Sequence, residues 1–454
     1  MKIILTLRRR WILCLCIVGL LGFLINALTF YPGYMSNDTI TQLRQALGIE
    51  QPDNMLPLAM VGVWRILIKF THHVSSMMLF QLSLFWLSLS LLSVYIYRET
   101  KDMKKSLLPF TIGILPFILN ISGVVWKDNQ MAFSLLLACV GVLYFKYVHT
   151  RGARIALLSM SLILMIYAAL VRYNAIVAIV PLMYLAVSES GLFKKRHFKI
   201  LVTMGTVGAT VIGFSAIGFV MNANRGNPTA FVMIDDIANV TTMPLINSSN
   251  ASGEFKSGIK KIKECAAIKG SLVNNYWICS GESQREKLQR DFFPDLKSLW
   301  VNTIFTHPLD YVLFKLQAFE SFLLPREGSY YVWQNGIESN DLGQSVKNER
   351  LGAMTDMYVN DFGYKYFKFM YEPWFWLVVC GMLSGYVLKK KTNVTIITLV
   401  SSAILYIFSY LPTGATVDYR FIYWSVIACL VAIVLLVTLD NTNTLQSSTK
   451  HKTR

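Results

Sequence analysis

Long apolar stretches alternate with short clusters of lysine and arginine along most of this chain. Apolar residues make up 54% of the sequence and charged residues only 15%, whereas an average soluble domain carries about 25% charged residues. An apolar segment satisfies its backbone groups in lipid by forming a helix. The sequence therefore predicts an all-α polytopic membrane protein.

The apolar stretches predict about ten transmembrane helices. Their approximate ranges are 11–30, 77–97, 106–121, 129–146, 155–171, 174–190, 200–221, 373–388, 394–411 and 420–438. With an even number of spans, the connections on the side of the termini are the basic segments 98–105, 146–154, 194–199 and 389–391. Because basic loops stay cytoplasmic, we expect both termini to be cytoplasmic.

The span pattern divides the chain into four regions. Residues 1–221 hold about seven spans and a first outer loop at 31–56, and the segment 222–372 forms a small, mostly helical outer domain. Residues 373–440 hold three more spans, and residues 441–454 form a cytoplasmic tail. The first span lacks a small-residue cleavage site, so we expect an uncleaved helix rather than a signal peptide.

The formal net charge of +17 follows the predicted topology. The outer segment 222–372 holds 16 Lys and Arg against 17 Asp and Glu, so most of the basic excess lies in the termini and inner loops. Such loops orient a membrane protein and attract anionic lipid headgroups. The charge distribution therefore does not indicate nucleic-acid binding.

The outer segment carries further local patterns. Helical patterns occur near 254–270 and 283–303, and the apolar stretch 308–324 is expected to pack against the membrane face. Cys265 and Cys279 are the only cysteines there; a disulfide between them is the favoured interpretation, and two free thiols are the alternative. A separate short apolar stretch, 57–70, is typical of an interfacial helix on the outer surface.

The charges that remain near the spans all fall on the predicted outer face. A pump or channel would place such groups near the middle of the membrane. An enzyme that acts on a lipid-linked substrate at one leaflet would place them at this face. These residues are Asp38, Lys127, Asp128, Arg172, Asp418 and Arg420.

The first outer loop begins where Pro32 and Gly33 end the first span. Asp38 follows shortly afterwards, and two roles are open for it. Its side chain either caps the next helix or, at a partly desolvated membrane surface, acts as a general base toward a sugar hydroxyl. Arg44, further along the same predicted helix, binds either a phosphate or lipid headgroups.

Cations stand at two further outer turns. Lys127 and Asp128 precede a span, where they form an interfacial anchor or contact a lipid-linked phosphate and its sugar. Arg172 and Asn174 lie in a tight turn at headgroup level. Arginine binds phosphate through several N–H donors, and snorkelling to the interface is the alternative.

The last outer turn contains Asp418, Tyr419 and Arg420. The acid and the base form either an internal pair or part of a basic cradle for a phosphate. Asp235 and Arg326 in the outer segment are weaker candidates. Asp235 adjoins a second carboxylate, and adjacent carboxylates are usually solvated. The sequence contains no zinc-binding Cys/His spacing, no Walker loop and no dinucleotide fingerprint.

Four of these elements together resemble a known class. Pro32-Gly33-Tyr34-Met35-Ser36-Asn37-Asp38, Trp126-Lys127-Asp128, Arg172-Tyr173-Asn174 and Asp418-Tyr419-Arg420 are similar to motifs of GT-C membrane glycosyltransferases. Within that class they resemble the bacterial O-antigen glucosyltransferases that alter serotype. The resemblance implies a GT-C-like fold in the bacterial inner membrane with a periplasmic active site.

The resemblance also implies roles for the residues. Asp38 would be the catalytic base, and Lys127, Arg172 and Arg420 would bind the donor phosphate, which is the leaving group. The donor would be a polyprenyl-phosphate-linked hexose such as glucose, and the acceptor a lipid-linked O-antigen glycan near the outer domain. A donor synthase and a flippase are implied partners.

Several alternatives stay open from the sequence. Transfer is either inverting or retaining, and no cofactor is required. A divalent cation is compatible with the carboxylates of Asp38, Asp128 and Asp235, since hard cations bind oxygen ligands. The rival functions are an O-antigen polymerase or ligase and a non-enzymatic transporter or lipid flippase.

Overall fold

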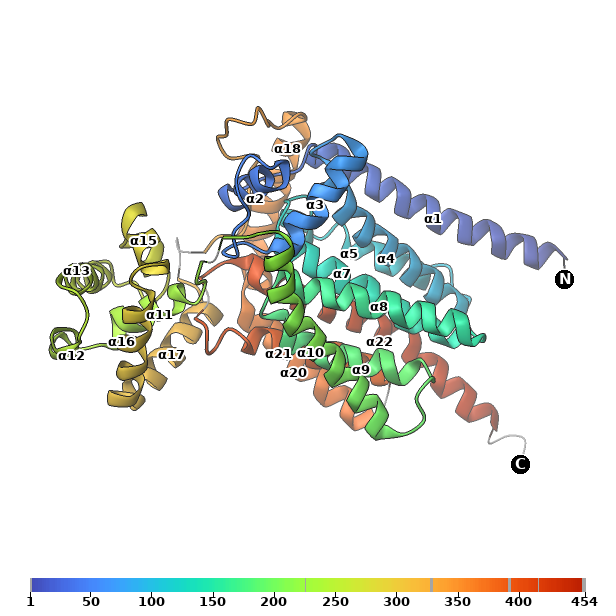
Figure 1. The fold of residues 1–454 in the computed structure, drawn as a ribbon. Helices are drawn as coiled ribbons and strands as arrows, with labels where there is room; N and C mark the ends of the chain where they lie inside the picture. Colours follow the sequence, from blue (N-terminus) through green and yellow to red (C-terminus); the bar gives the residue numbers. More distant parts are fainter. Residues whose placement is uncertain (1, 225, 327–329, 391–392, 415, 451–454) are drawn as a thin grey trace.

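The computed structural model describes residues 2–224, 226–326, 330–390, 393–414 and 416–450, with side chains described between residues 9 and 439. Figure 1 shows a bundle of long, roughly parallel helices and a smaller group of short helices at one end of it. We call the end of the bundle that carries these short helices the outer end. The start of α1 and the end of α22 lie at the opposite end (Figure 1).

The bundle helices occupy every position that the apolar pattern predicts. They are α1 Lys2–Phe30, α4 Ser76–Thr100, α5 Leu108–Ile112, α6 Pro116–Ser122, α7 Lys127–Leu143, α8 Arg151–Val171, α9 Ala175–Glu189, α10 Arg196–Val220, α20 Pro373–Lys390, α21 Val394–Phe408 and α22 Tyr423–Lys450. Three single-turn 3₁₀ segments adjoin α5, α7 and α22: η1 Lys105–Leu107, η2 Tyr144–Tyr147 and η5 Tyr419–Ile422.

Not all of these helices are long enough to span a membrane by themselves. Within the described residues, six are long and apolar enough, and the bent pair formed by α5 and α6 makes a seventh. Helices α9 and α21 are apolar but shorter. The chain is therefore a multi-pass membrane protein, and the number of ten spans stays a prediction.

The predicted span 106–121 is broken into two helices. Helices α5 and α6 meet at an angle of 53°. Pro116 starts α6, where the N–H that proline lacks has no helical partner to lose. Gly113 follows α5, and a Cβ there would lie 2.6 Å from the Trp86 ring. The break is therefore dictated by a proline and by close packing against a tryptophan.

Helices α7 and α22 form the centre of the bundle. Both are mostly buried, and α7 packs against α4, α8 and α22. Helices α1 and α10 lie at the periphery, and the rest of the protein leaves most of their apolar side chains uncovered. Such exposed apolar faces are suited to lipid contact.

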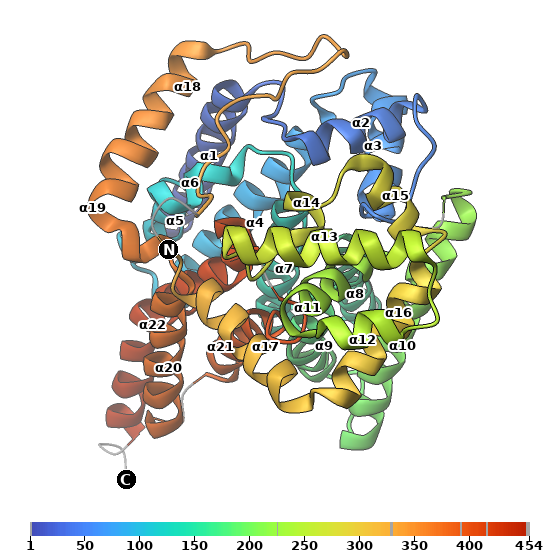
Figure 2. The same cartoon turned by 90° about the vertical axis from the view of Figure 1, so that its left-hand side faces the viewer.

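Seven short helices of the segment 222–372 pack together, and from here on we call this part alone the outer domain: α11 Ala230–Val240, α12 Met243–Ser248, α13 Gly253–Lys269, α14 Asn275–Ile278, α15 Glu282–Gln289, α16 Phe293–Thr306 and α17 Pro308–Leu323. It has its own apolar core, which includes Ile234, Phe255, Ile259 and Leu296. Helix α13 matches the predicted pattern at 254–270, and α15 and α16 share the pattern at 283–303. Figure 2 shows this domain in front of α7, α8 and α9.

The remaining helices cover the bundle near its outer end. They are α2 Asn37–Leu47, α3 Leu58–Thr71, α18 Glu349–Asp356, the π-helix η3 Met357–Tyr364, α19 Lys365–Phe367 and η4 Lys368–Tyr371. Helix α3 corresponds to the apolar stretch 57–70 and packs against α2, α4 and α8. Helix α17 reaches the bundle through Phe319 and Phe322, whose rings contact Phe408 and Tyr410.

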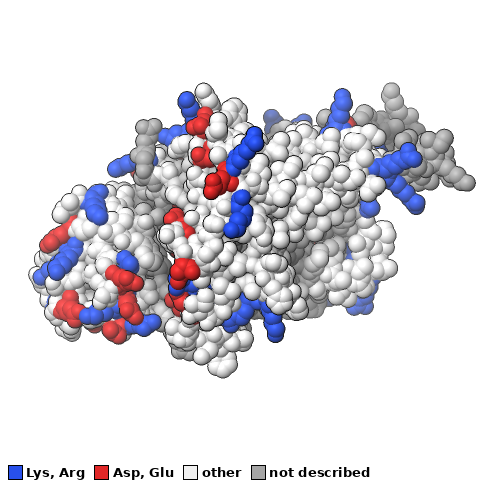
Figure 3. Space-filling model, turned by 90° about the horizontal axis from the view of Figure 1, so that it is seen from above, with Lys and Arg blue, Asp and Glu red and all other residues white. Residues whose placement is uncertain are grey.

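Charged side chains are unevenly distributed over the surface. Figure 3 shows acidic and basic groups mixed on the outer domain, and Lys and Arg toward the end where α1 starts. A broad band without charged groups lies between them on this face (Figure 3). This distribution is typical of a bundle embedded in lipid between two polar surfaces.

Candidate functional site

The first outer loop is held beside the segment that precedes α7. The Val125 N–H donates to the Tyr34 carbonyl at 2.9 Å, and the Tyr34 N–H donates to the Gly123 carbonyl at 3.2 Å. The Thr39 hydroxyl donates to the Val125 carbonyl at 2.8 Å. Because Asp38 precedes Thr39 directly, this pairing brings Asp38 next to the start of α7.

The loop between α6 and α7 is fixed by buried amide side chains. Gln81 Nε2 donates to the carbonyls of Ser122 and Val124 at 2.9 and 2.8 Å. Asn129 Nδ2 donates to the Val124 carbonyl at 2.7 Å, and Gln130 Nε2 donates to Gln81 Oε1 at 2.9 Å. Buried backbone groups need such partners. These contacts lock the orientation of Lys127 and Asp128, and no sequence motif indicated them.

The segment that follows the outer domain joins the first outer loop to the last. The Met35 N–H donates to the Gly336 carbonyl at 3.1 Å, and the Glu338 N–H donates to the Met35 carbonyl at 2.9 Å. The Tyr419 N–H donates to the Tyr331 carbonyl at 2.9 Å. Residues near 331–338 therefore hold Asp38 and Asp418 in fixed positions, a role that no sequence motif indicated.

The six predicted outer charges come together at the outer ends of the central helices, and we call them the charged cluster. Arg172 Nη1 lies 3.2 Å from Asp128 Oδ1. Arg420 lies 2.9 Å from Asp418, between its Nε and Oδ2, and 3.8 Å from Asp38, between its Nη1 and Oδ2. Lys127 interacts electrostatically with Asp38, Asp128, Arg172 and Arg420.

Aromatic rings line both guanidinium groups of the charged cluster. Arg172 Cζ lies 4.4 Å from the Phe421 ring centroid, and Arg420 Cζ lies 4.7 Å from that of Trp126. The Arg172 Nη2 group also donates to the Tyr410 hydroxyl at 2.7 Å. No sequence motif indicated Tyr410 or Phe421, although Phe421 directly follows a predicted phosphate-binding residue. The rings and ion pairs hold both arginines in place.

The members of the charged cluster differ in how accessible they are. The Asp128 side chain is fully buried, and the side chains of Arg172 and Arg420 are 10% and 17% exposed. Asp38 is half-exposed. Each guanidinium carries five N–H donors, of which the contacts above use two, so both arginines retain donors for a further anion. The cluster can therefore bind a phosphate beside one accessible carboxylate.

Burial changes the acidity of Asp418. Desolvation raises its pKa from 3.8 to about 6, and the adjacent Arg420 opposes the increase. A protonated Asp418 no longer attracts the Arg420 guanidinium as a charge. Protonation of Asp418 near pH 6 therefore removes one of the charges that face Arg420.

Two further predicted residues lie near the charged cluster. Asn174 occupies the N-cap position of α9 without a capping hydrogen bond from its side chain. The Tyr419 hydroxyl donates to the Phe117 carbonyl and is buried, so this tyrosine anchors the last outer turn. Neither side chain joins the ion pairs of the cluster.

The structure places three predicted residues away from the charged cluster. Arg44 forms ion pairs with Glu50, at 3.0 Å, and with Asp341. Arg326 lines a separate cavity beside α17. The Asp235 carboxylate accepts the backbone N–H groups at the start of α14, at 2.9 and 2.7 Å, so it stabilises the outer domain.

The expectation that the adjacent carboxylates at 235 and 236 are solvated is wrong. Asp236 is fully buried, and its Oδ1 lies 2.5 Å from Lys315 Nζ. Its Oδ2 accepts the indole N–H of Trp300 at 2.7 Å. A buried carboxylate needs such a cation and such donors. The sequence gives no local signal for them, because both partners lie more than 60 residues away.

Two chemical predictions concern disulfides and metals. Cys265 and Cys279 form a disulfide that joins α13 to the end of α14. Among the described residues, no group of three or more His, Cys, Asp or Glu side chains is arranged to hold a metal ion. Asp38, Asp128 and Asp235 therefore do not converge on a common cation position.

Comparison with known proteins gives one distant likeness. No protein-family model and no curated protein sequence matches this chain. The apo crystal structure of the Archaeoglobus fulgidus oligosaccharyltransferase aligns with a TM-score of 0.40 and 13% identity, over 96% of this chain and 52% of that chain. The same archaeal enzyme, AglB, in complex with an inhibitory peptide and a dolichol-phosphate gives 0.41 and 12%, with the same coverage.

This chain thus spans about half the length of the solved structures that it matches. At this level of similarity, neither a common fold nor a common activity is established.

Proposed function

We propose that this protein is a GT-C-type glycosyltransferase that moves a hexose, glucose in the first instance, from a polyprenyl phosphate to a lipid-linked glycan. We place it in a bacterial inner membrane with the charged cluster on the periplasmic face and an O-antigen glycan as acceptor. The observation that supports this proposal is the cluster itself. It combines one accessible carboxylate with three cations at the outer ends of the bundle helices.

The cations suit the leaving group of this reaction. As the bond between the sugar C1 and the phosphate oxygen breaks, its electron pair stays on the phosphate. Arg172 and Arg420 are held by ion pairs and aromatic rings, and Lys127 lies near both. Cations fixed in advance stabilise charge that develops in the transition state. We assign donor-phosphate binding to these three residues.

Asp38 suits the role of general base. It is the most accessible carboxylate of the charged cluster, since Asp128 and Asp418 are buried against arginines. The acceptor hydroxyl oxygen bonds to C1, and its proton passes to Asp38. A retaining mechanism needs a second carboxylate as nucleophile. With the other two engaged, we propose a single displacement that inverts the anomeric configuration.

A transfer assay with purified protein tests the proposal. Wild-type protein in nanodiscs receives a polyprenyl-phosphate-linked hexose and a lipid-linked glycan. We expect sugar transfer, and we expect Asp38→Asn to lower its rate at least about 100-fold, as the loss of a general base does. Asp361→Asn is the matched control, because this exposed carboxylate lies in η3, outside the cluster. Full activity of Asp38→Asn would show that Asp38 is not the general base.

The same assay separates the rival functions. A polymerase or ligase would use a whole glycan on a pyrophosphate and ignore the single-sugar donor. A transporter or flippase would move the donor across the bilayer without breaking the bond to C1. Transfer from the single-sugar donor to the glycan is the outcome that the proposal requires.

A further inference from the structure

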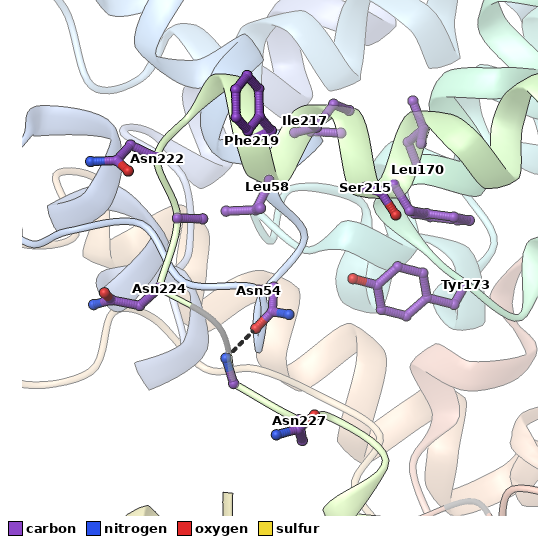
Figure 4. Close-up of a pocket in the computed structure, with 15 residues that line it drawn as sticks. Asn54, Leu58, Leu170, Tyr173, Ser215, Ile217, Phe219, Asn222, Asn224 and Asn227 are labelled. Atoms are coloured by element: carbon purple, nitrogen blue, oxygen red, sulfur yellow. Dashed lines mark hydrogen bonds between the residues drawn. The ribbon is translucent and has the colours of Figure 1, made fainter. Parts of the chain in front are cut away.

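A cavity opens at the turn that follows α8. Its volume is about 860 Å³, and it is lined by residues of the 51–59 region, the end of α8, the end of α10 and the segment after α10. Cavities that hold small ligands measure about 300–1,000 Å³. Figure 4 shows asparagine side chains at one side of this cavity and apolar side chains with Tyr173 at the other. We call it the asparagine groove.

One side of the asparagine groove is lined with amide side chains. Four amides contribute, from Asn54, Asn222, Asn224 and Asn227. An amide both donates and accepts hydrogen bonds, which matches a sugar hydroxyl. The four amides therefore suit a hydroxyl-rich ligand such as a sugar.

Not all of these amides are free for a ligand. The Asn54 Oδ1 accepts the Gly226 N–H at 2.7 Å, and Asn227 Nδ2 donates to the Gln289 carbonyl at 2.7 Å. These two side chains hold the rim together. The side chains of Asn222 and Asn224 form no hydrogen bond within the described part of the chain. They are the groups that a ligand can engage.

Aromatic and apolar side chains complete the asparagine groove. The rings of Tyr173 and Phe214 pack edge to face with centroids 4.7 Å apart. Leu58, Leu170 and Ile217 extend the apolar wall. The outer part of α10 that borders the groove belongs to a peripheral, largely exposed helix. A ligand with sugars on one side and a lipid chain on the other fits this division.

The asparagine groove and the charged cluster share one turn. Arg172 points to Asp128 and Tyr410 in the cluster, whereas the next residue, Tyr173, lies against Phe214 in the groove. Consecutive Cα atoms are about 3.8 Å apart. The groove and the charged cluster therefore meet at the backbone of this turn.

We propose that the asparagine groove binds sugars of the lipid-linked acceptor. This assignment rests on the proposed function, because the charged cluster already accounts for the donor phosphate. The groove presents the acceptor hydroxyl to the cluster, with Asn222 and Asn224 bonded to neighbouring hydroxyls. Asn222 and Asn224 then determine acceptor specificity and take no part in donor binding.

The test measures binding of a sugar to the full-length protein in nanodiscs. The probe is a soluble oligosaccharide released from the surface polysaccharide of the host cell, and binding is followed by saturation-transfer NMR. We expect Ser215→Trp, which fills the groove, to weaken binding at least about tenfold, and Asn224→Leu to weaken it severalfold. Val220→Trp is the matched control, because Val220 lies on the same helix, is 81% exposed and does not line the groove.

The outcomes separate this proposal from the proposed function. Binding by the wild type and by the donor-site variant Lys127→Gln, with loss in Ser215→Trp, supports the groove as an acceptor site. Equal binding by Ser215→Trp and Val220→Trp, or no binding by the wild type, overturns it. A wild-type protein that binds the oligosaccharide but transfers no hexose contradicts the proposed function and leaves the groove assignment standing. In the transfer assay, a raised KM for the donor instead of the acceptor in Asn224→Leu also overturns the proposal.

Discussion

Arg172 depends on a single buried acid. Asp128 is fully buried, and Arg172 is its ionic partner at 3.2 Å. In a low-dielectric site, a pair of opposite charges costs much less free energy than one unpaired charge. Asp128 therefore holds Arg172 in position, and the stability of the buried Arg172 charge depends on this acid.

We predict that Asp128→Asn destabilises the protein. Removal of one partner of a buried pair leaves the other charge uncompensated and costs about 3–5 kcal/mol. Thermal unfolding in detergent should show a lowered midpoint, whereas the exposed Asp361→Asn should match the wild type. An unchanged midpoint for Asp128→Asn would show that Arg172 does not need this acid.

The pKa of Asp418 predicts a pH dependence of catalysis. Burial raises this pKa to about 6, so Asp418 is ionised and attracts Arg420 only above about pH 6. We expect kcat/KM for sugar transfer to fall as the pH drops through about 6, and Asp418→Asn to lose this step and stay at the low level. The stability effect has the opposite sign. Because the folded-state pKa lies above the value of about 3.9 in an unfolded chain, ionisation of Asp418 lowers the free energy of unfolding between about pH 4 and 6.

A kcat/KM that is unchanged between pH 5 and 7, or a step that persists in Asp418→Asn, would show that ionisation of Asp418 does not govern Arg420.

At the scale of single elements, the junction between α6 and α7 sets the geometry of the charged cluster. Gly123 lies so close to Phe30 that an added Cβ would approach its ring to 1.9 Å. The same residue accepts the Tyr34 N–H and so holds the first outer loop. A larger residue at this point forces α1 and the loop apart.

We predict that Gly123→Ala lowers sugar transfer at least about tenfold while the protein still inserts into the membrane. Overpacking of this kind costs about 1–3 kcal/mol, and here the displacement moves Asp38 away from Lys127. The double variant with Phe30→Ala should recover part of the activity, because it removes the clash. Gly208→Ala is the control, since nothing lies within 4 Å of a Cβ added there. Equal activity of the two single variants would contradict the packing argument.

A second prediction at this scale concerns the outer domain. Burial raises the pKa of Asp235 to about 7, although two backbone N–H groups at the start of α14 stabilise its charged form. Between about pH 4 and 7 the folded state therefore binds more protons than the unfolded state, and the free energy of unfolding falls as the pH rises. We expect Asp235→Asn to flatten this slope in unfolding measured by urea. A slope that is identical in the variant would exclude Asp235 as its source.

The sequence predicted the elements better than their connections. Apolar length alone located all ten bundle segments, because the membrane restricts the chain to helices. The break at Pro116 and the burial of Asp236 were not predicted, since both depend on packing against distant residues. The pairing of residues 331–338 with both outer loops was also missed, because isolated bridges leave no periodic pattern.

At the scale of the whole molecule, charge is separated along the bundle. Helix α7 starts at Lys127 and ends near Lys146, and α8 starts at Arg151 and ends beside Arg172. Antiparallel helices thus place the charged cluster at one end and the basic loops at the other. Short polar motifs spread over nearly 400 residues meet at a single point for this reason.

From this arrangement we infer that the charged cluster faces the outside of the cell, which is the central claim. From the positive-inside bias we infer that the basic loops are cytoplasmic and that the outer domain and the cluster lie at the opposite face. A carrier lipid that presents its sugar at that face then reaches Asp38 without crossing the bilayer. If the orientation were reversed, the proposed donor and acceptor would both be out of reach.

Cysteine labelling in intact cells tests this claim most directly. Ser339→Cys adds a thiol to the exposed segment beside the first outer loop, and Lys195→Cys adds one to an exposed position in the predicted inner loop at 194–199. A membrane-impermeant maleimide should label position 339 from outside and position 195 only after the membrane is permeabilised. Labelling of position 195 from outside, with position 339 protected, would contradict the account.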